Sequence, residues 1–280
     1  MLLREKIIKI SAIIPTFNRA EVLPRAIDSI INQTISCHEI IVIDDGSTDK
    51  TFEILKEYIE NKQIVYKKTE NKGVSAARND AIKLASGDWI SFLDSDDEWL
   101  PIKNEKQLEI LKLENTNLIH GEEIWIRNGK RVNPKFKHKK TGGMIFEKCL
   151  PLCLISPSAT MIKKSILQEF GGFDESFIVC EDYDLWLKIT LRNPVSFVET
   201  PVINKYGGHE DQLSMKFKAM DYYRIKSMQR ILITELLSAK QQELIKKEII
   251  CKGEILLNGY QKHNNMQNYK EVEAWMSKCK

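Results

Sequence analysis

Short apolar runs and amphipathic stretches alternate along the first hundred residues. The apolar runs cover residues 10–14, 40–43, 64–66 and 87–93. Between them, apolar residues recur every three or four positions, as in helices with one buried face. The clearest set is Val22, Leu23, Ala26, Ile27, Ile30 and Ile31. This alternation of strand and helix predicts an α/β fold with a doubly wound, mostly parallel central sheet.

The later pattern predicts further strands and helices. Strands are expected over 118–127, 154–162 and 197–203, with a hairpin turn at residues 128–130. Helices are expected over 104–113, over 164–169 and after Asp182.

The composition shifts beyond residue 215, where proline is absent and the sequence predicts a helical tail. We therefore expect one large domain over 1–214, with halves of about 1–100 and 101–214, and a helical extension over 215–280. The extension is expected to pack on the main domain. Self-association through its helices and contact with lipid remain alternatives.

Acidic residues gather where the predicted strands end. Asp44 and Asp45 follow the second strand, and Asp94, Asp96 and Asp97 follow the fourth. Ligands of doubly wound sheets bind beyond the carboxyl ends of the strands. Carboxylates this close repel one another, so a hard cation such as Mg²⁺ or Mn²⁺ is expected among them. The simpler interpretation is an acidic turn that caps the next helix.

Two common nucleotide-binding loops are missing. The first predicted strand ends in Pro15-Thr16-Phe17-Asn18-Arg19 instead of the glycine fingerprint of dinucleotide-binding domains, and no Walker loop occurs in the sequence. NAD chemistry and P-loop chemistry are therefore not expected.

Composition is that of a globular protein: 42% of the 280 residues are hydrophobic and 29% are charged. The formal net charge of +3 is too small to indicate a nucleic-acid partner. The six scattered cysteines are expected to be free thiols in a reducing compartment. Without a recognisable signal peptide or an apolar run of membrane-spanning length, we expect a cytoplasmic protein, with any membrane contact peripheral and at the inner face.

One stretch is strongly basic. Residues 130–140, here called the basic loop, contain six lysines and arginines and no acid: Lys130, Arg131, Lys135, Lys137, Lys139 and Lys140. The simplest interpretation is a solvated loop. The alternatives are a lid that contacts anions or a patch that meets a membrane surface.

Five segments stand in an order that points to a known family: Ile14–Arg19, Ile43–Asp49, Asn71–Asn79, Phe92–Trp99 and Glu181–Leu187. Together they resemble the family 2 inverting glycosyltransferases, which have the GT-A fold. The resemblance covers about residues 10–214 and leaves the tail and the basic loop without a counterpart.

The resemblance implies that the first loops hold the uridine of a UDP-sugar. It assigns nucleotide-sugar contacts to Pro15, Phe17, Asp45, Asn71, Arg78, Asp94, Ser95 and Asp96. Asp45 would accept a charge-assisted hydrogen bond from the uracil imide. For Arg78, a contact with the diphosphate and a structural salt bridge to Asp94 both remain open.

Asp94-Ser95-Asp96 is similar to the family's DxD motif, which implies a Mn²⁺ or Mg²⁺ ion on the diphosphate. Asp96 is the implied ligand, with Asp97 as the alternative. His209 resembles the histidine that completes this metal site in many GT-A enzymes; the alternative is an exposed loop histidine.

Asp182 matches the family's catalytic base, and capping of the helix that follows is its alternative role. Gly171-Gly172 resembles the glycine loop that lets the backbone approach the substrates. The sequence thus predicts a metal-dependent hexosyl- or N-acetylhexosaminyltransferase that acts on a hydroxyl of a glycan or lipid-linked acceptor.

Two other functions use similar architecture. A sugar-phosphate nucleotidyltransferase should carry a glycine-rich, basic loop after the first strand, which this chain lacks. A non-catalytic sugar-nucleotide or glycan-binding module would keep the fold, but it would not need Asp45, Asp96 and Asp182 together.

Overall fold

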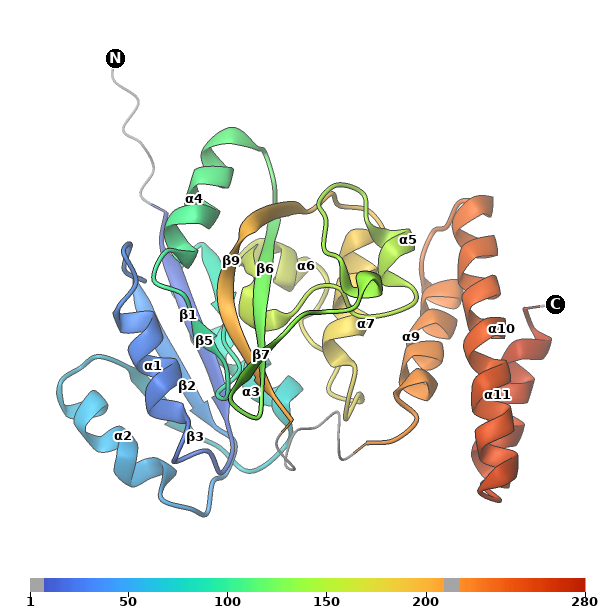
Figure 1. The fold of residues 1–280 in the computed structure, drawn as a ribbon, viewed down its shortest axis with the longest axis horizontal. Coiled ribbons are helices and arrows are strands. Elements are labelled where there is room, and N and C mark those ends of the chain that lie inside the picture. Colours follow the sequence, from blue (N-terminus) through green and yellow to red (C-terminus); the bar gives the residue numbers. More distant parts are fainter. Residues whose placement is uncertain (1–7, 209–216, 280) are drawn as a thin grey trace.

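The computed structural model describes residues 8–208 and 217–279. Within these ranges one nine-stranded sheet runs in the order β3-β2-β1-β4-β8-β6-β9-β5, with β7 paired to β6. Helices lie on both sides of its first half (Figure 1). The expected doubly wound α/β fold is confirmed.

The first half of the sheet is parallel and follows the predicted alternation. Its strands are β1 (Ile10–Thr16), β2 (Glu39–Asp44), β3 (Val65–Lys68) and β4 (Trp89–Phe92). The connecting helices are α1 (Leu23–Ile31), α2 (Thr51–Glu60) and α3 (Val74–Leu84). Every residue of β1 and β4 is buried, because neighbouring strands and covering helices leave no face to solvent.

The second half of the sheet is mixed. Its strands are β5 (Glu98–Trp99), β6 (Leu118–Arg127), β7 (Lys130–Val132), β8 (Met161–Lys163) and β9 (Ser196–Gly207). β6 and β9 are parallel, whereas β8 is antiparallel to both β4 and β6. The predicted hairpin is confirmed by the pairing of β6 with β7.

Short helices connect these strands. They are α4 (Lys103–Leu113), α5 (Phe146–Cys149), α6 (Lys164–Glu169), α7 (Glu181–Thr190) and the single 3-10 turns η1 (Phe136–His138) and η2 (Pro157–Ala159). The predicted helices over 104–113 and over 164–169 are confirmed within one residue, and the helix expected after Asp182 begins slightly earlier, at Glu181.

The prediction of a strand over 154–162 was wrong for most of these residues. Pro157 has no N–H to donate to a ladder, and it starts the 3-10 turn η2. The Thr160 hydroxyl donates to the Pro157 carbonyl at 2.7 Å, which closes the turn locally. Only Met161–Lys163 pairs as β8.

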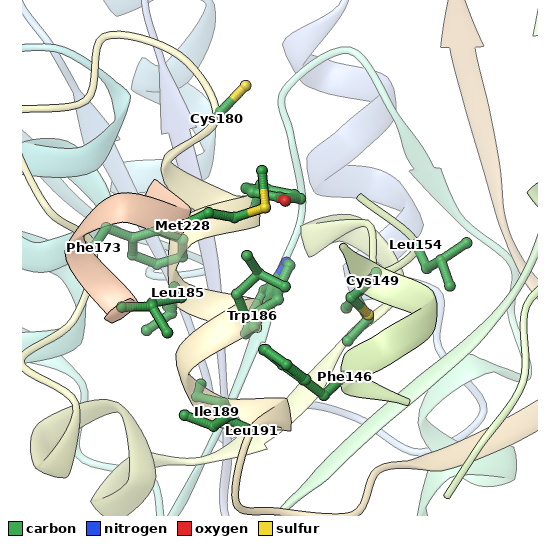
Figure 2. Close-up of a cluster of buried hydrophobic side chains, with 14 of the residues drawn as sticks. Phe146, Cys149, Leu154, Phe173, Cys180, Leu185, Trp186, Ile189, Leu191 and Met228 are labelled. Carbon is green, nitrogen blue, oxygen red and sulfur yellow. The ribbon is translucent and has the colours of Figure 1, made fainter. Parts of the chain in front are cut away.

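The C-terminal helices α9 (Met220–Thr234), α10 (Ala239–Lys262) and α11 (Met266–Ser277) gather at one end of the molecule, beside α5 and α7 (Figure 1). Figure 2 shows Met228 of α9 and Phe146 of α5 near Trp186 of α7. These residues belong to one core cluster, so the expectation that the tail packs on the main domain is confirmed. The expected boundary at 214/215 lies outside the described residues.

Two expectations from composition can be compared with the fold. All six cysteines are free thiols, as expected. No helix in residues 8–208 and 217–279 is both long enough and apolar enough to cross a bilayer.

Candidate active site

The loops after β2 and β3 are joined by the Asp45 carboxylate. It accepts hydrogen bonds from the backbone N–H groups of Lys72 and Gly73, each at 2.8 Å. The Asp45 N–H donates to the Thr16 carbonyl, also at 2.8 Å, which ties in the end of β1. Asp45 therefore fixes the spacing of three loops. Its contact with uracil stays a prediction, for which the carboxylate has lone pairs left.

Other residues that were predicted to contact the nucleotide-sugar lie at this edge of the sheet. Pro15 is buried within β1, and the next side chain but one, Phe17, is 43% exposed. Asn71 follows β3 and is exposed. Its backbone lies so close to Gly46 that a Cβ on Gly46 would be 3.0 Å from the Asn71 backbone nitrogen. Gly46 also has a φ of +81°, so this close approach depends on glycine.

Arg78 of α3 bridges two acidic segments. Its guanidinium donates to the Asp94 carboxylate at 2.7 Å and to the Glu181 carboxylate at 2.6 Å. The side chain is 4% exposed. Burial alone would lower the pKa of Arg78, but the Asp94 and Glu181 charges raise it above its ordinary value. The salt bridge that the sequence left open is confirmed, and a contact of Arg78 with the donor stays a prediction.

Glu181 begins α7 and is buried. Burial raises the pKa of its carboxyl group, and the Asp182 charge raises it further, against the opposing effect of Arg78. The bridge from Asp94 through Arg78 to Glu181 thus places the end of β4 next to the start of α7. The bridge therefore joins the first, parallel half of the fold to the second, mixed half.

The acidic turn after β4 contains two differently placed aspartates. Both oxygens of Asp97 accept hydrogen bonds inside the fold, from the Ser158 hydroxyl at 2.6 Å and the Tyr206 N–H at 2.9 Å. Burial raises the pKa of Asp97 well above its ordinary value, and the Asp96 charge adds to the rise. Asp97 therefore holds the turn in place. Because both of its oxygens already accept hydrogen bonds, Asp97 is less suited than Asp96 to bind a metal ion. Ser95 is buried and Asp96 is half-buried.

The donor set at this turn fits a divalent cation held mainly through a substrate. No group of three or more metal-binding side chains is gathered within residues 8–208 and 217–279. Mg²⁺ is often bound by one or two carboxylates plus the phosphates of a substrate, for which Asp96 and a diphosphate would suffice. His209, the other predicted ligand, lies outside the described residues.

Asp182 occupies the second position of α7, inside the helix that was expected to follow it, and is half-buried. One carboxylate oxygen accepts from the Tyr183 N–H at 2.7 Å, so Asp182 does satisfy an amide of the first helical turn. The other oxygen accepts from the Cys153 thiol at 3.4 Å. The capping role and a catalytic role are thus compatible, because they use different oxygens.

A small pocket of about 70 Å³ opens beside Asp182. We call it the Asp182 pocket; its lining residues are Glu123, Trp125, His138, Lys140, Leu152, Cys153, Leu154, Ile155, Ser156, Asp182 and Lys205. Of the three acids in the first turn of α7, Asp182 alone lines it. Glu181 is bonded to Arg78, and Asp184 is bonded to Lys188 at 2.6 Å.

Charges of both signs surround the Asp182 pocket. Lys140 pairs with Glu123 at 2.9 Å. Burial alone would raise the pKa of Glu123, but the charges of Lys140 and Lys205 outweigh burial and lower this pKa to about 2. Lys205 donates to the Ser156 hydroxyl at 2.8 Å. Burial would lower the pKa of Lys205, but Glu123 first, and then Asp97, Asp94 and Asp182, raise it. Lys205 is therefore a cation held between the acidic turn and the pocket.

The glycines expected to approach the substrates form a tight turn against α3. Gly171 and Gly172 both have a φ of +74°, and a Cβ on Gly172 would lie 2.5 Å from the Asn79 side-chain oxygen. Asn79 follows Arg78 on α3 and also accepts from the Phe173 N–H at 2.9 Å. This turn therefore locks α3 to the segment before α7. Its contact with substrates stays a prediction.

Comparison with known families decides the class of this site. The profile described as "Glycosyl transferase family 2" matches residues 11–171. The chain belongs to glycosyltransferase family 2. It is accordingly an enzyme of the glycosyltransferase class with a GT-A-like fold.

Several family 2 relatives support this assignment. The Escherichia coli UDP-Glc:alpha-D-GlcNAc-diphosphoundecaprenol beta-1,3-glucosyltransferase WfgD is 32% identical over 214 residues, or 75% of this chain and 82% of WfgD. An uncharacterized glycosyltransferase of Rickettsia bellii is 35% identical over 185 residues. That match covers 66% of this chain and only 27% of the relative, which is much longer.

A solved structure supports the fold of this family 2 chain. S. aureus TarS residues 1–349, in complex with UDP, superimposes with a TM-score of 0.68 at 17% identity. The superposition covers 97% of this chain and 92% of TarS 1–349. The same TarS fragment with UDP-GlcNAc gives a TM-score of 0.65. At this level of identity the likeness extends to the fold alone.

Proposed function

We propose that this family 2 enzyme is an inverting, metal-dependent glycosyltransferase that moves a sugar from a UDP-sugar to a hydroxyl group. The acceptor is a glycan or a lipid-linked saccharide, and the sugar is a hexose or an N-acetylhexosamine. The observation that carries the proposal is the bridge of Arg78 between Asp94 and Glu181, which puts the DxD turn beside Asp182 and its pocket.

The donor end of the site is proposed to lie over the carboxyl edge of β1, β2 and β4. Phe17 offers an exposed aromatic face for a base, and Asp45 offers a rigid carboxylate for the uracil edge. Asn71 and Ser95 are proposed to contact the same nucleotide. TarS complexes with UDP and UDP-GlcNAc support the choice of nucleotide.

Asp96, with His209 as its proposed partner, would hold a Mn²⁺ or Mg²⁺ ion that neutralises the charge growing on the departing UDP. The rest of the chemistry falls to the chain's own residues. Asp182 takes the proton of the acceptor hydroxyl as that oxygen attacks the anomeric carbon from the side opposite UDP. A single displacement of this kind inverts the configuration.

The acceptor is proposed to enter the Asp182 pocket. Trp125 lines it, and the Trp125 N–H donates to Glu123 at 2.9 Å, which fixes the indole for packing against a sugar face. Lys205 could meet a phosphate of a lipid-diphosphate acceptor. The acceptor of WfgD, a diphosphoundecaprenol-linked GlcNAc, has this chemistry, and such a substrate is consistent with action at the inner face of the cell membrane.

The metal requirement is tested by titrating UDP calorimetrically with Mn²⁺ and with EDTA, and then screening UDP-glucose, UDP-galactose and their N-acetyl forms. We expect chelation to weaken UDP binding, because the ion links Asp96 to the diphosphate. Asp96→Ala should lose most of this metal dependence. Asp80→Ala, which removes an acid of α3 that pairs with Lys67, should keep it. Equal UDP affinity of the wild type with Mn²⁺ and with EDTA would contradict the metal role.

A further inference from the structure

The exposed part of the basic loop presents a dense positive charge. The loop carries six formal positive charges and no acid, whereas the whole chain has a net charge of only +3. Five of these side chains are exposed: Lys130, Arg131, Lys135, Lys137 and Lys139. None of the five forms an ion pair with a carboxylate in the described part of the chain.

An aromatic side chain stands at the centre of this charge. Phe136 is 88% exposed, although burial of a phenylalanine is favourable by about 1.5–3 kcal/mol. It lies in the 3-10 turn η1, where the His138 N–H donates to the Lys135 carbonyl at 2.9 Å. The turn therefore presents Phe136 between Lys135 and Lys137. An exposed aromatic flanked by lysines suits the boundary between lipid headgroups and acyl chains.

The same loop is anchored to the Asp182 pocket. The His138 ring lies 5.1 Å from the Trp125 ring, and both residues line the pocket. Lys140 ends the loop as a buried cation, paired with Glu123 at 2.9 Å and donating to the Leu154 carbonyl at 2.7 Å. The sequence-based interpretation of the basic loop as wholly solvated was thus wrong for Lys140. The loop has a fixed base at the pocket and an exposed, charged turn.

The positive charges of these lysines act on His138, which lies in the same loop. Burial lowers the pKa of His138, and the charges of Lys137, Lys140 and Lys135 lower it further. The turn therefore has excess positive potential that a negatively charged surface would relieve. A nucleic acid is disfavoured as the partner because the basic stretch is short and the whole chain is nearly neutral.

We propose that the basic loop docks this enzyme on an anionic bilayer, with Phe136 inserted at the headgroup level and Lys135, Lys137 and Lys139 against lipid phosphates. Because the base of the loop forms a wall of the Asp182 pocket, docking would turn the pocket toward acceptors carried by the bilayer. The inference rests on the proposed function for its purpose, but the contact itself can be measured without any transfer reaction.

The test is co-sedimentation with vesicles of phosphatidylcholine alone or of equal parts phosphatidylcholine and phosphatidylglycerol. We expect binding to the anionic vesicles only, and loss of that binding at about 0.5 M NaCl, where surface charges are screened. The triple variant K135Q/K137Q/K139Q should bind about a hundredfold more weakly, at roughly fivefold per lysine. Phe136→Ala should bind about tenfold more weakly, since the inserted ring is lost.

A matched triple variant, K56Q/K112Q/K262Q, removes the same charge from exposed lysines of α2, α4 and α10. It should bind anionic vesicles nearly as the wild type does. Equal losses in the two triple variants, an unaffected Phe136→Ala variant, or no binding by the wild type at low salt would overturn the docking proposal.

Failure of docking is distinguishable from failure of the proposed function. UDP binding, measured on the same variants, should be unchanged, because none of the substituted side chains lines the donor edge or the Asp182 pocket. Loss of vesicle binding with intact UDP binding supports the docking role. Vesicle binding by a wild-type chain that binds no UDP-sugar would keep the docking surface and reject the proposed function.

Discussion

Asp182→Asn should slow sugar transfer by about a hundredfold or more while leaving UDP binding unchanged. General-base catalysis is typically worth about 10²- to 10⁴-fold, and an amide cannot accept the acceptor's proton. The asparagine oxygen can still accept from the Tyr183 N–H, as the carboxylate does at 2.7 Å. The melting temperature should therefore stay close to that of the wild type. Steady-state transfer rates, UDP calorimetry and thermal melts on one preparation check all three expectations.

A second asparagine on the same helix is the control. Asp184 is buried and bonded to Lys188 at 2.6 Å, and it does not line the Asp182 pocket. Asp184→Asn should lower the stability while leaving turnover roughly unchanged. Wild-type turnover in Asp182→Asn would mean that Asp182 serves only the first turn of α7, which is the capping role that the sequence left as the alternative.

Arg78→Met should destabilise the fold by about 3–5 kcal/mol, because it leaves two carboxylates without the cation between them. The Arg78 side chain is 4% exposed and Glu181 is 8% exposed, so water replaces the lost charge poorly at Glu181. Asp94 is 30% exposed and contributes less to the loss. Urea denaturation at neutral pH measures the loss.

The surface pair of Arg230 with Asp174 is the matched control for this change. Arg230 is 37% exposed, and Arg230→Met should lower the free energy of unfolding by at most about 1 kcal/mol.

The Arg78→Met and Arg230→Met variants should also differ in the pH dependence of their stability. Arg78 opposes the rise that burial causes in the pKa of Glu181, so without Arg78 that pKa is raised further and stability is lost as pH rises above the ordinary value of this carboxyl. The deficit of Arg78→Met should be larger at pH 8 than at pH 5, and a deficit no greater than that of Arg230→Met would contradict the bridge.

The parallel half of the fold was predictable because its signals are local. Apolar runs and helical periodicity fall within single elements, as in 10–14 and in the apolar face of α1. The strand predicted over 154–162 failed where Pro157 offered a local turn in competition with the sheet. The same apolar composition serves a buried strand and a buried irregular segment, so periodicity could not separate them.

The candidate site divides in the same way. The acids after β2 and β4 could be placed at the edge of the sheet because each follows an apolar run directly, and Asp182 was proposed through the family resemblance. Glu123, Trp125 and Lys205 were missed, because they meet only through the parallel pairing of β6 with β9, in which Trp125 lies opposite Lys205. A buried acid inside a predicted strand was the available signal for Glu123, since a buried carboxylate requires a cationic partner. The sequence did not indicate that this cation would be Lys140.

The anomeric configuration of the transferred sugar, followed by NMR during transfer onto a lipid-diphosphate acceptor, tests the central claim most directly. The donor is the UDP-sugar chosen by the calorimetric screen. Attack by the acceptor hydroxyl, deprotonated by Asp182 on the side opposite UDP, predicts a product in which the configuration of the donor is inverted. A product that retains the donor's configuration would contradict a single displacement at this site.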